Sequence, residues 1–376
     1  MKIARSKLIS STRLVLAVLS AAACGSQGAE REIETEARTS YPAAAELRHH
    51  ICHRVAGRIA VDGRLDEPGW AAAEWSETFV DIEGYERPVP RWRTRFKMLW
   101  DDESLYIGAE LEEPHVWATL TERDAVIYRE NDFEVFIDPD GDTHNYYELE
   151  VNALGTVWDL FLAKPYRDGG KAQSEWDIAG LRSAVSVHGT VNDPSDRDQG
   201  WTVELAIPWS ALVDYAPDHR RPRDGEHWRL NFSRVQWQLE ETGGGYRKAM
   251  GQGRPLPERN WVWSPHGAVN MHMPEMWGIV QFSDTVAGKG DVPHRPPPDE
   301  DVRWALRRVY YAQRSYYRSH ERYTADLGEL GVDFAGPARS PYRLALALTA
   351  GGFEARGAGD GGAIWHIRQD GRIWSE

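Results

Sequence analysis

Between about residue 47 and residue 284 the hydrophobic residues fall into short runs, several of which alternate with polar residues. Turn-forming Gly, Pro, Asp and Asn residues separate the runs, and no helical periodicity longer than a few turns interrupts them. Alternation places successive side chains on opposite faces of a strand, so this pattern predicts a mainly β protein built as an antiparallel β-sandwich. The clearest predicted strands are residues 94–99, 105–111, 133–137, 147–151, 157–162, 201–207, 228–235 and 279–282.

The pattern changes after a proline cluster at residues 293–298. We interpret residues 285–300 as a semi-rigid, Pro-rich linker. Beyond it, apolar residues recur at spacings of three and four as far as His320, which predicts one amphipathic helix. Residues 301–376 are therefore expected to form a small α+β domain, in which the helix precedes a short antiparallel sheet. Its predicted strands are residues 342–348, 352–355 and 363–368.

The first residues have the features of a targeting segment. Basic residues precede an apolar run at 14–19, and small residues at 20–23 end at Cys24. The run is shorter than the roughly 20 residues that span a bilayer, so residues 1–24 are predicted to be a cleavable signal peptide. Small residues before a cysteine resemble the lipobox of bacterial lipoproteins, which implies acylation of Cys24. The alternative is an ordinary secretory signal with an incidental cysteine.

Residues 25–45, rich in Gly, Ala, Ser and Glu, are predicted to be a flexible tether between the membrane and the first domain. Cys52 is the only other cysteine, so a structural disulfide would have to join the signal region to the domain. We therefore expect an exported lipoprotein of the cell envelope, in the periplasm or at the outer membrane.

Composition narrows the possible ligands. The formal net charge is -14, with acidic residues spread among aromatic ones, so a nucleic acid would meet repulsion over most of the surface. Tryptophan is abundant, with 17 residues. Indole rings fill protein cores, and they also stack on flat apolar faces of ligands such as sugars. Composition alone does not choose between these two uses.

Five separated blocks of the central region carry a family resemblance. They are residues 59–70 (IAVDGRLDEPGW), 96–113, 131–138 (NDFEVFID), 201–209 (WTVELAIPW), and 261–264 with 277–278. Their order and content resemble family 9 carbohydrate-binding modules. The resemblance implies that residues 46–284 form the β-sandwich of that family. It also implies a non-catalytic protein that captures an oligo- or polysaccharide and is associated with carbohydrate catabolism.

In that family two aromatic rings sandwich the terminal sugar, while a Glu, an Arg and Asn-type residues bind its hydroxyls. The resemblance places Tyr128 at the first ring and Glu134 at the hydroxyl-binding Glu. Asn152 is retained, but Glu150 stands where the family has its Arg, which reverses the charge. At the closing loop Met271 stands where the second ring is expected. Trp263 and His272 lie near Met271 in sequence, as does Trp261, and we take Trp263, Met271 and His272 as candidate carbohydrate-binding residues.

One acidic segment could hold a metal ion. Asp138, Asp140, Asp142 and Glu148 lie in the stretch IDPDGDTHNYYE, where carboxylates alternate around a glycine. Carboxylate oxygens are the ligands that Ca²⁺ prefers, although the full twelve-residue pattern of an EF-hand is missing. Family members hold structural calcium, so the resemblance favours a Ca²⁺ site here. The alternative is a solvated acidic hairpin turn.

The sequence leaves two other classes of function as alternatives to carbohydrate binding, a haem-binding electron-transfer domain and a glycoside hydrolase. Related sandwich domains bind haem through Met, His or Lys, and Met271, His272, Met273, His266 and Met276 offer such ligands. Adjacent residues on a strand point to opposite faces, so Met271 and His272 could not both reach one iron. No nucleophile elbow or zinc-binding His-Glu motif is present in the sequence. A glycoside hydrolase activity is therefore suggested only by the resemblance to a family that accompanies such enzymes, and not by a catalytic motif in this sequence.

The C-terminal region has a second resemblance. Its helix and the sheet after it are similar to the globular part of type IV pilin-like proteins, without their hydrophobic assembly helix, so at most the fold is implied. The residues concerned are Val309, Tyr310, Tyr311, Ala312, Gln313, Tyr316 or Tyr317, Tyr323 and 327–330.

Overall fold

The computed structural model describes residues 47–331, 343–359 and 361–376. The predicted signal peptide, Cys24 and the whole of the predicted tether lie outside the described residues. Within the described part of the chain, none of the helices has both the length and the apolar character needed to cross a membrane.

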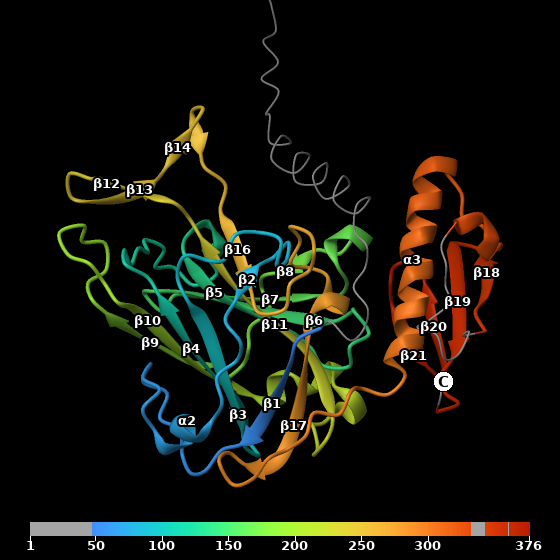
Figure 1. Ribbon diagram of the computed structural model, residues 1–376, viewed down its shortest axis with the longest axis horizontal. Helices are drawn as coiled ribbons and strands as arrows, with labels where there is room; N and C mark the ends of the chain where they lie inside the picture. The colour runs from blue at the N-terminus through green and yellow to red at the C-terminus, as the bar shows by residue number, and fades with distance from the viewer. Residues whose placement is uncertain (1–46, 332–342, 360) are drawn as a thin grey trace, which may run out of the picture. The chain divides into compact units, whose positions relative to one another are not determined.

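Thirteen strands of the described residues form one continuous sheet (Figure 1). Its order is β8-β7-β6-β5-β11-β17-β1-β3-β4-β10-β9, and β16 pairs with β11 and β2. The strands are β1 (His49–Arg54), β2 (Val80–Asp81), β3 (Thr94–Trp100), β4 (Ser104–Glu112), β5 (Asp132–Asp138), β6 (Tyr146–Asn152), β7 (Val157–Leu162), β8 (Ala172–Gln173), β9 (Arg182–His188), β10 (Gly200–Pro208), β11 (His227–Gln236), β16 (Arg259–Val262) and β17 (Gly278–Val286).

Short elements surround this sheet. The helix α2 covers Pro68–Ala72. The hairpins are β12 (Leu239–Thr242) with β13 (Gly245–Lys248), and β14 (Met250–Gly251) with β15 (Arg254–Pro255). Single 3₁₀ turns include Ile127–Arg129 before β5 and Tyr166–Asp168 after β7. These two turns are important because they flank the strands that carry the site described below.

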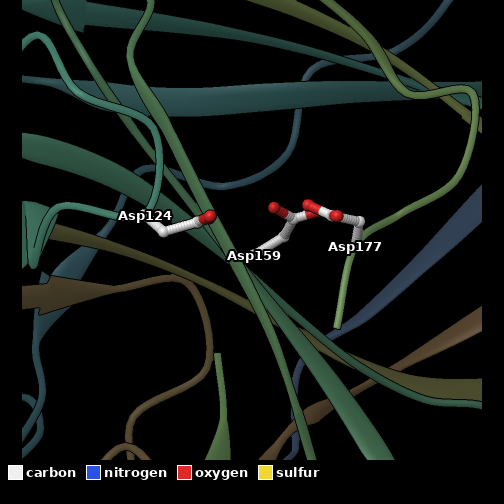
Figure 2. A group of neighbouring side chains, drawn as sticks. All are labelled: Asp124, Asp159 and Asp177. Carbon is white, nitrogen blue, oxygen red and sulfur yellow. The ribbon is translucent and has the colours of Figure 1, made fainter. Parts of the chain in front are cut away.

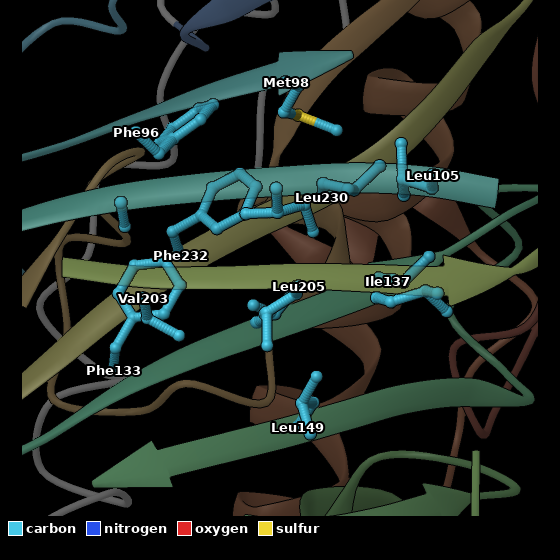
Figure 3. Close-up of a cluster of buried hydrophobic side chains, with 14 of the residues drawn as sticks. Phe96, Met98, Leu105, Phe133, Ile137, Leu149, Val203, Leu205, Leu230 and Phe232 are labelled. Carbon is cyan, nitrogen blue, oxygen red and sulfur yellow. The ribbon is translucent and has the colours of Figure 1, made fainter. Parts of the chain in front are cut away.

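The two halves of the sheet pack against each other. Phe133 and Ile137 of β5 lie in one buried cluster with Val203 and Leu205 of β10 and with Met98 of β3 (Figure 3). Each large apolar side chain removed from water in this way stabilises the fold by about 1.5–3 kcal/mol. The predicted mainly β fold and β-sandwich are confirmed, and the core lies between the two halves.

The alternation in β5 and β6 decides which residues enter that core. Phe133, Val135 and Ile137 point inward from β5, as do Leu149 and Val151 from β6. The residues between them therefore lie on the opposite face of the sheet. On β5 and β6 those residues are mainly carboxylates, and this face is the candidate site.

The β1 strand was not predicted, and it departs from the antiparallel pattern. It runs parallel to both of its neighbours, pairing over most of its length with β17 and at two residues with β3. Antiparallel pairing usually follows from a short hairpin connection. β1 and β17 are more than 220 residues apart in the chain, so no hairpin dictates their relative direction.

The C-terminal region contains the predicted helix and sheet. Helix α3 spans Glu300–His320, and the 3₁₀ turn Leu327–Leu330 follows it. A separate four-stranded sheet then has the order β18-β19-β20-β21. Its strands are β18 (Ala345–Thr349), β19 (Gly352–Ala358), β20 (Ile364–Arg368) and β21 (Ile373–Ser375) (Figure 1).

Helix α3 also packs against the last part of the central domain. Leu306 and Tyr310 share a buried cluster with Met276 and Ile279. Charged groups cross the same contact, since Arg229 of β11 forms an ion pair with Glu300 at the start of α3. The Pro-rich residues before α3 therefore connect two parts of the chain that share buried surface.

The best-defined polar link in this contact is the pair Arg167–Glu275. The Arg167 guanidinium donates to both oxygens of Glu275 at 2.7 and 2.8 Å, and the Tyr311 hydroxyl of α3 donates to the same carboxylate. Both charged side chains are almost fully buried. Burial alone would raise the pKa of Glu275, but the adjacent Arg167 charge outweighs that effect and lowers the pKa to about 2.

Replacing Glu275 is expected to weaken the fold in a pH-dependent way. Because the folded pKa lies below the unfolded value of about 4.5, the pair stabilises the protein above pH 4.5, and this contribution is lost as the pH falls towards 2. Glu275→Gln should therefore lower the free energy of unfolding at neutral pH by about 3 kcal/mol and flatten its decline below pH 4.5. Thermal or urea denaturation from pH 2 to pH 7 measures both effects.

Glu240→Gln is the matched control. The Glu240–Arg247 pair has a similar 3.0 Å contact but lies largely in solvent, so its loss should cost less than about 1 kcal/mol. Equal losses in the two variants would show that the buried pair does not hold the C-terminal region in place.

Candidate functional site

A row of polar side chains crosses the outer face of the sheet half formed by β7, β6, β5 and β11. Trp158 pairs in register with Glu150, Glu150 with Glu134, and Glu134 with Ser233. Residues directly opposite each other on neighbouring strands have Cβ atoms about 5 Å apart, so these four side chains lie next to one another. Backbone pairing on all four strands holds them in this order.

Two more carboxylates extend the row along the strands. Asp132 lies two residues before Glu134 on β5, and Glu148 lies two residues before Glu150 on β6. We call Asp132, Glu134, Glu148 and Glu150 the acidic face. All four residues are buried, with exposed fractions of 5% or less.

Few protein groups donate hydrogen bonds to the carboxylates of the acidic face. Asp132 Oδ1 accepts a hydrogen bond from the Val235 amide at 3.0 Å, and Glu150 Oε2 accepts one from the Tyr128 amide at 2.8 Å. In contrast, Asp132 Oδ2 and Glu134 Oε2 have no hydrogen-bond partner, although they are buried. The same holds for two atoms beside them, Ser233 Oγ and Trp158 Nε1. A buried polar atom without a partner costs about 1–3 kcal/mol, so this face is arranged for something other than stability.

Burial and mutual repulsion change the acidity of these groups. Burial raises the pKa of Glu134 to about 7. Burial also raises the pKa values of Asp132, Glu148 and Glu150 well above the usual range, and the neighbouring carboxylates add to the shift. Strongly perturbed carboxyl groups gathered on one face are typical of functional sites.

Aromatic side chains form the rim of the face. The Tyr128 and Trp158 rings lie 6.2 Å apart and are inclined by 31°. Tyr166, in the turn after β7, interacts electrostatically with Glu148 and Glu150 and with Tyr128. Tyr128 and Tyr166 are each 42% exposed, so rings accessible to solvent stand beside buried carboxylates.

His272 closes one end of the face. Its Nδ1 lies 3.1 Å from the Tyr146 hydroxyl and its Nε2 lies 4.0 Å from Glu148, while the Tyr166 ring meets it edge-on at 4.4 Å. Burial lowers the pKa of His272 to about 3, so the ring is neutral at physiological pH. Met271 is partly buried against the aromatic cluster behind this end.

The structure gathers most of the predicted carbohydrate-binding residues, but not all of them. Tyr128, Glu134, Glu150 and His272 meet on or beside the acidic face. Asn152 lies at its edge, where its side chain bonds Leu120 O, Glu130 and two backbone amides of the turn after β6, and therefore shapes that turn.

Trp263 lies elsewhere. It is fully buried in the core, in edge-on contact with Phe96 and Phe232, and its Nε1 donates to Glu77. Sequence spacing near the closing loop could not show which face of the sheet this indole would occupy. The structure places it on the core side, away from the acidic face.

The predicted calcium ligands are divided. Asp138, Asp140 and Asp142 lie together, with possible ligand oxygens within 4.8 Å of one another, but Glu148 belongs to the acidic face. The two Asp138 oxygens accept hydrogen bonds from the Gly141 and Thr143 amides, each at 2.9 Å. The Arg372 side chain donates a hydrogen bond to Asp142. Groups of the protein thus satisfy part of the hydrogen-bonding capacity and charge of these carboxylates. Calcium binding by this loop stays a prediction.

The haem ligands that the sequence offered have other contacts. The His266 ring contacts Asn231 through Nε2 at 2.7 Å and the Asn270 carbonyl through Nδ1 at 2.6 Å, which leaves neither nitrogen for iron. Met273 and Met276 are buried in the cluster beneath α3. The remaining pair is Met271 and His272, which are consecutive in the chain.

A third group of carboxylates, Asp124, Asp159 and Asp177, lies where β7 passes two loops (Figure 2). Arg123 serves this group through contacts of 2.5 Å to Asp159 and 2.7 Å to Asp177. One arginine therefore compensates part of the negative charge of these three carboxylates.

The sequence analysis missed four residues that lie on or beside the acidic face, namely Asp132, Trp158, Ser233 and Tyr166. Asp132 could have been found because it lies two residues before Glu134 in the chain. Trp158 could have been found because it lies directly opposite Glu150 on the next predicted strand. Ser233 lies about one hundred residues further along the chain, and only the pairing of β11 with β5 brings it next to Glu134. No pattern in the sequence marks Tyr166, which the turn Tyr166–Asp168 carries to the rim.

The fold and this face together define a class: a β-sandwich with an aromatic-rimmed, carboxylate-rich binding face. Residues 61–227 match the model of the family described as carbohydrate family 9 binding domain-like. This segment of the central domain is therefore similar to that carbohydrate-binding family. The matched segment includes β3 to β10, whereas β11, which supplies Ser233, lies almost entirely beyond it.

Two curated enzymes are similar to the central part of this chain. Exoglucanase XynX of Acetivibrio thermocellus is 25% identical over 163 residues, and endo-1,4-beta-xylanase A of Thermoanaerobacterium saccharolyticum is 26% identical over 163 residues. Each alignment covers 43% of this chain but only 13% and 12% of the enzymes. A solved family 9 module from Caldicellulosiruptor kristjanssonii in complex with cellotriose has 18% identity and a TM-score of 0.40, covering 66% of this chain and 100% of that one.

Trp263 and Tyr128 should respond differently to truncation. Trp263→Ala removes a fully buried indole and should lower the free energy of unfolding by about 3–5 kcal/mol. Tyr128→Ala removes a ring that is 42% exposed and should cost less than half as much. Urea denaturation of the two variants measures the difference, and similar losses would contradict the placement of Trp263 in the core.

Proposed function

We propose that the acidic face binds carbohydrate without transforming it. The observation that carries this proposal is the row Trp158, Glu150, Glu134 and Ser233 beneath the exposed rings of Tyr128 and Tyr166. A sugar presents an apolar C–H face that stacks on aromatic rings and hydroxyl groups that both donate and accept hydrogen bonds. Its hydroxyls would give partners to the carboxylate, hydroxyl and indole N–H groups that have none.

The family match supports the same ligand class, and so does the likeness to parts of an exoglucanase and a xylanase. We infer from this that the protein serves carbohydrate catabolism by capturing oligo- or polysaccharide. Oligomers of β-linked glucose and of xylose are the first ligands to test.

The arrangement of the carboxylates supports binding more than hydrolysis. Asp132, Glu134 and Glu150 offer oxygens within 4.8 Å of one another. Retaining glycosidases place their two carboxyl groups about 5–5.5 Å apart, and inverting enzymes about 6.5–9.5 Å apart, on opposite sides of the scissile bond. Three carboxylates on one flat sheet face lie on the same side of any ligand, so they do not flank a glycosidic bond.

Removing the rim rings should weaken saccharide binding. Tyr128→Ala and Tyr166→Ala should each raise the dissociation constant by about two- to ten-fold, because each loses an aromatic stacking contact worth about 0.5–1.5 kcal/mol. Glycan arrays followed by calorimetry with cellotriose and xylo-oligosaccharides measure the effect. Tyr85→Ala is the matched control, since Tyr85 is 67% exposed and belongs to another part of the domain.

Unchanged affinity in both rim variants would place the binding site elsewhere on the sandwich. A saccharide consumed during incubation, followed by chromatography of the products, would contradict the non-catalytic proposal while leaving the site in place.

We also propose that the protein is exported and anchored in the cell envelope through acylated Cys24. The support is the basic, apolar and small-residue order of residues 1–24. Cys24→Ala should abolish incorporation of labelled palmitate and move the protein from the membrane to the soluble fraction of cells. Cys52→Ala is the control, because Cys52 is buried within β1. Equal palmitate incorporation in both variants would contradict the anchor.

A further inference from the structure

We propose that Asp132, Glu134 and Glu150 together hold one hard divalent cation, of the calcium type, on the acidic face. The inference deepens the proposed function, on which it rests for the identity of the site, because a cation there would present open coordination positions to a saccharide. The cation site itself is argued below from the three carboxylates and the atoms around them.

The oxygen positions suit such an ion. One ligand oxygen from each of the three carboxylates lies within 4.8 Å of the other two. Ca²⁺–O distances are about 2.3–2.6 Å, so two oxygens bound to the same ion can be separated by at most about 4.6–5.2 Å. The spacing of the three oxygens is therefore compatible with one shared ion after small side-chain adjustments.

The second observation is the set of buried atoms without partners. Asp132 Oδ2, Glu134 Oε2 and Ser233 Oγ are buried and make no hydrogen bond. Asp132 and Ser233 are 0% exposed and Glu134 is 4% exposed. Each of these atoms is an oxygen that can coordinate a hard cation, and each would gain a partner from a single bound ion.

Comparison with the other two carboxylate groups shows what is unusual here. Arg123 contacts the group Asp124, Asp159 and Asp177. Arg372 contacts Asp142 in the second group, and the charge of Arg303 acts on Asp138 and Asp140. Among the residues that the structure describes, no arginine or lysine forms a salt bridge with Asp132, Glu134, Glu148 or Glu150, and the one nearby ring, His272, is neutral. The acidic face is thus the carboxylate group in which no arginine or lysine of the described residues forms a salt bridge, although the charge of Arg234, which is paired with Glu113, acts on Asp132.

The donor set selects the kind of ion. All of the available ligands are oxygens, and no cysteine lies in the set, which favours calcium or a similar hard ion over zinc. Ca²⁺ takes six to eight oxygens, more than three carboxylates and one hydroxyl supply with one oxygen each. Adjacent sugar hydroxyls are suited to fill the remaining positions beneath Tyr128 and Tyr166.

Calorimetric titration of the purified chain with CaCl₂, after treatment with a chelator, tests the site. Glu134→Gln and Glu150→Gln keep the size of each side chain and remove one charge, and each should remove one bound calcium ion per chain or weaken its binding at least about ten-fold. Asp177→Asn and Asp140→Asn are the matched controls in the other two carboxylate groups. Neither should remove this ion, whatever the loop of Asp140 binds in addition.

Terbium gives an independent readout of position. Tb³⁺ replaces Ca²⁺ at oxygen sites and emits when a nearby indole is excited, and Trp158 is directly opposite Glu150. Emission with TbCl₃ should appear in the wild type and in Asp177→Asn, and should fall strongly in Glu134→Gln. Melting temperatures measured in chelator show whether each variant is folded before the titration.

Three outcomes decide the matter. Loss of one ion in the Glu134 and Glu150 variants alone supports the site. Calcium binding that is equal in all folded variants overturns it, and so does the absence of any calcium or terbium binding. Cellotriose or xylo-oligosaccharide binding measured with and without chelator separates this result from the proposed function, because saccharide binding that survives chelation keeps the function and overturns the cation's part in it.

Discussion

The molecule depends on one constraint, the two-residue alternation of β5 and β6 at the centre of one half of the sheet. Phe133, Val135 and Ile137 must enter the core between the two halves, and this forces the intervening residues of β5 to the opposite face. A shift of one residue would bury the carboxylates in the apolar core and expose the aromatic and aliphatic side chains. The apolar core thus fixes the position of the acidic face, and the same hydrophobic free energy keeps its carboxylates close together despite their repulsion.

That arrangement explains how much of the fold could be predicted. The eight strands expected in the central region are present, with ends that differ by only a few residues, because each carries its own apolar pattern. Helix α3 was visible for the same reason. In contrast, β1 and β9 were missed: β1 carries histidines and arginine, and β9 is only half-buried at the edge of the sheet. The parallel pairing of β1 depends on contacts between distant segments, which no local pattern encodes.

The site was predictable only where family resemblance or alternation gave a local signal. Tyr128, Glu134 and Glu150 lie within 25 residues of one another and were assigned to one site. Trp263 was assigned to the same site from its position near the closing loop. An indole at that position is equally compatible with the core, and the sequence does not distinguish the two. Ser233 and Tyr166 depend on strand order and on a turn, respectively, so they required the three-dimensional structure.

The two ways in which this chain buries charge lead to different consequences. At the contact with α3, Arg167 compensates Glu275 and lowers the pKa of that carboxyl, so the ionised pair contributes to the fold. On the acidic face no arginine or lysine of the described residues forms a salt bridge with a carboxylate, and burial and mutual repulsion raise the pKa values instead. A carboxylate with a raised pKa is protonated, or ionised at a cost, until a group from outside the fold compensates it. The first arrangement is complete within the protein, whereas the second is complete only with a proton, a cation or a ligand hydroxyl. Protons and a cation compete for the same carboxylate oxygens, so occupancy of this face by a cation depends on pH.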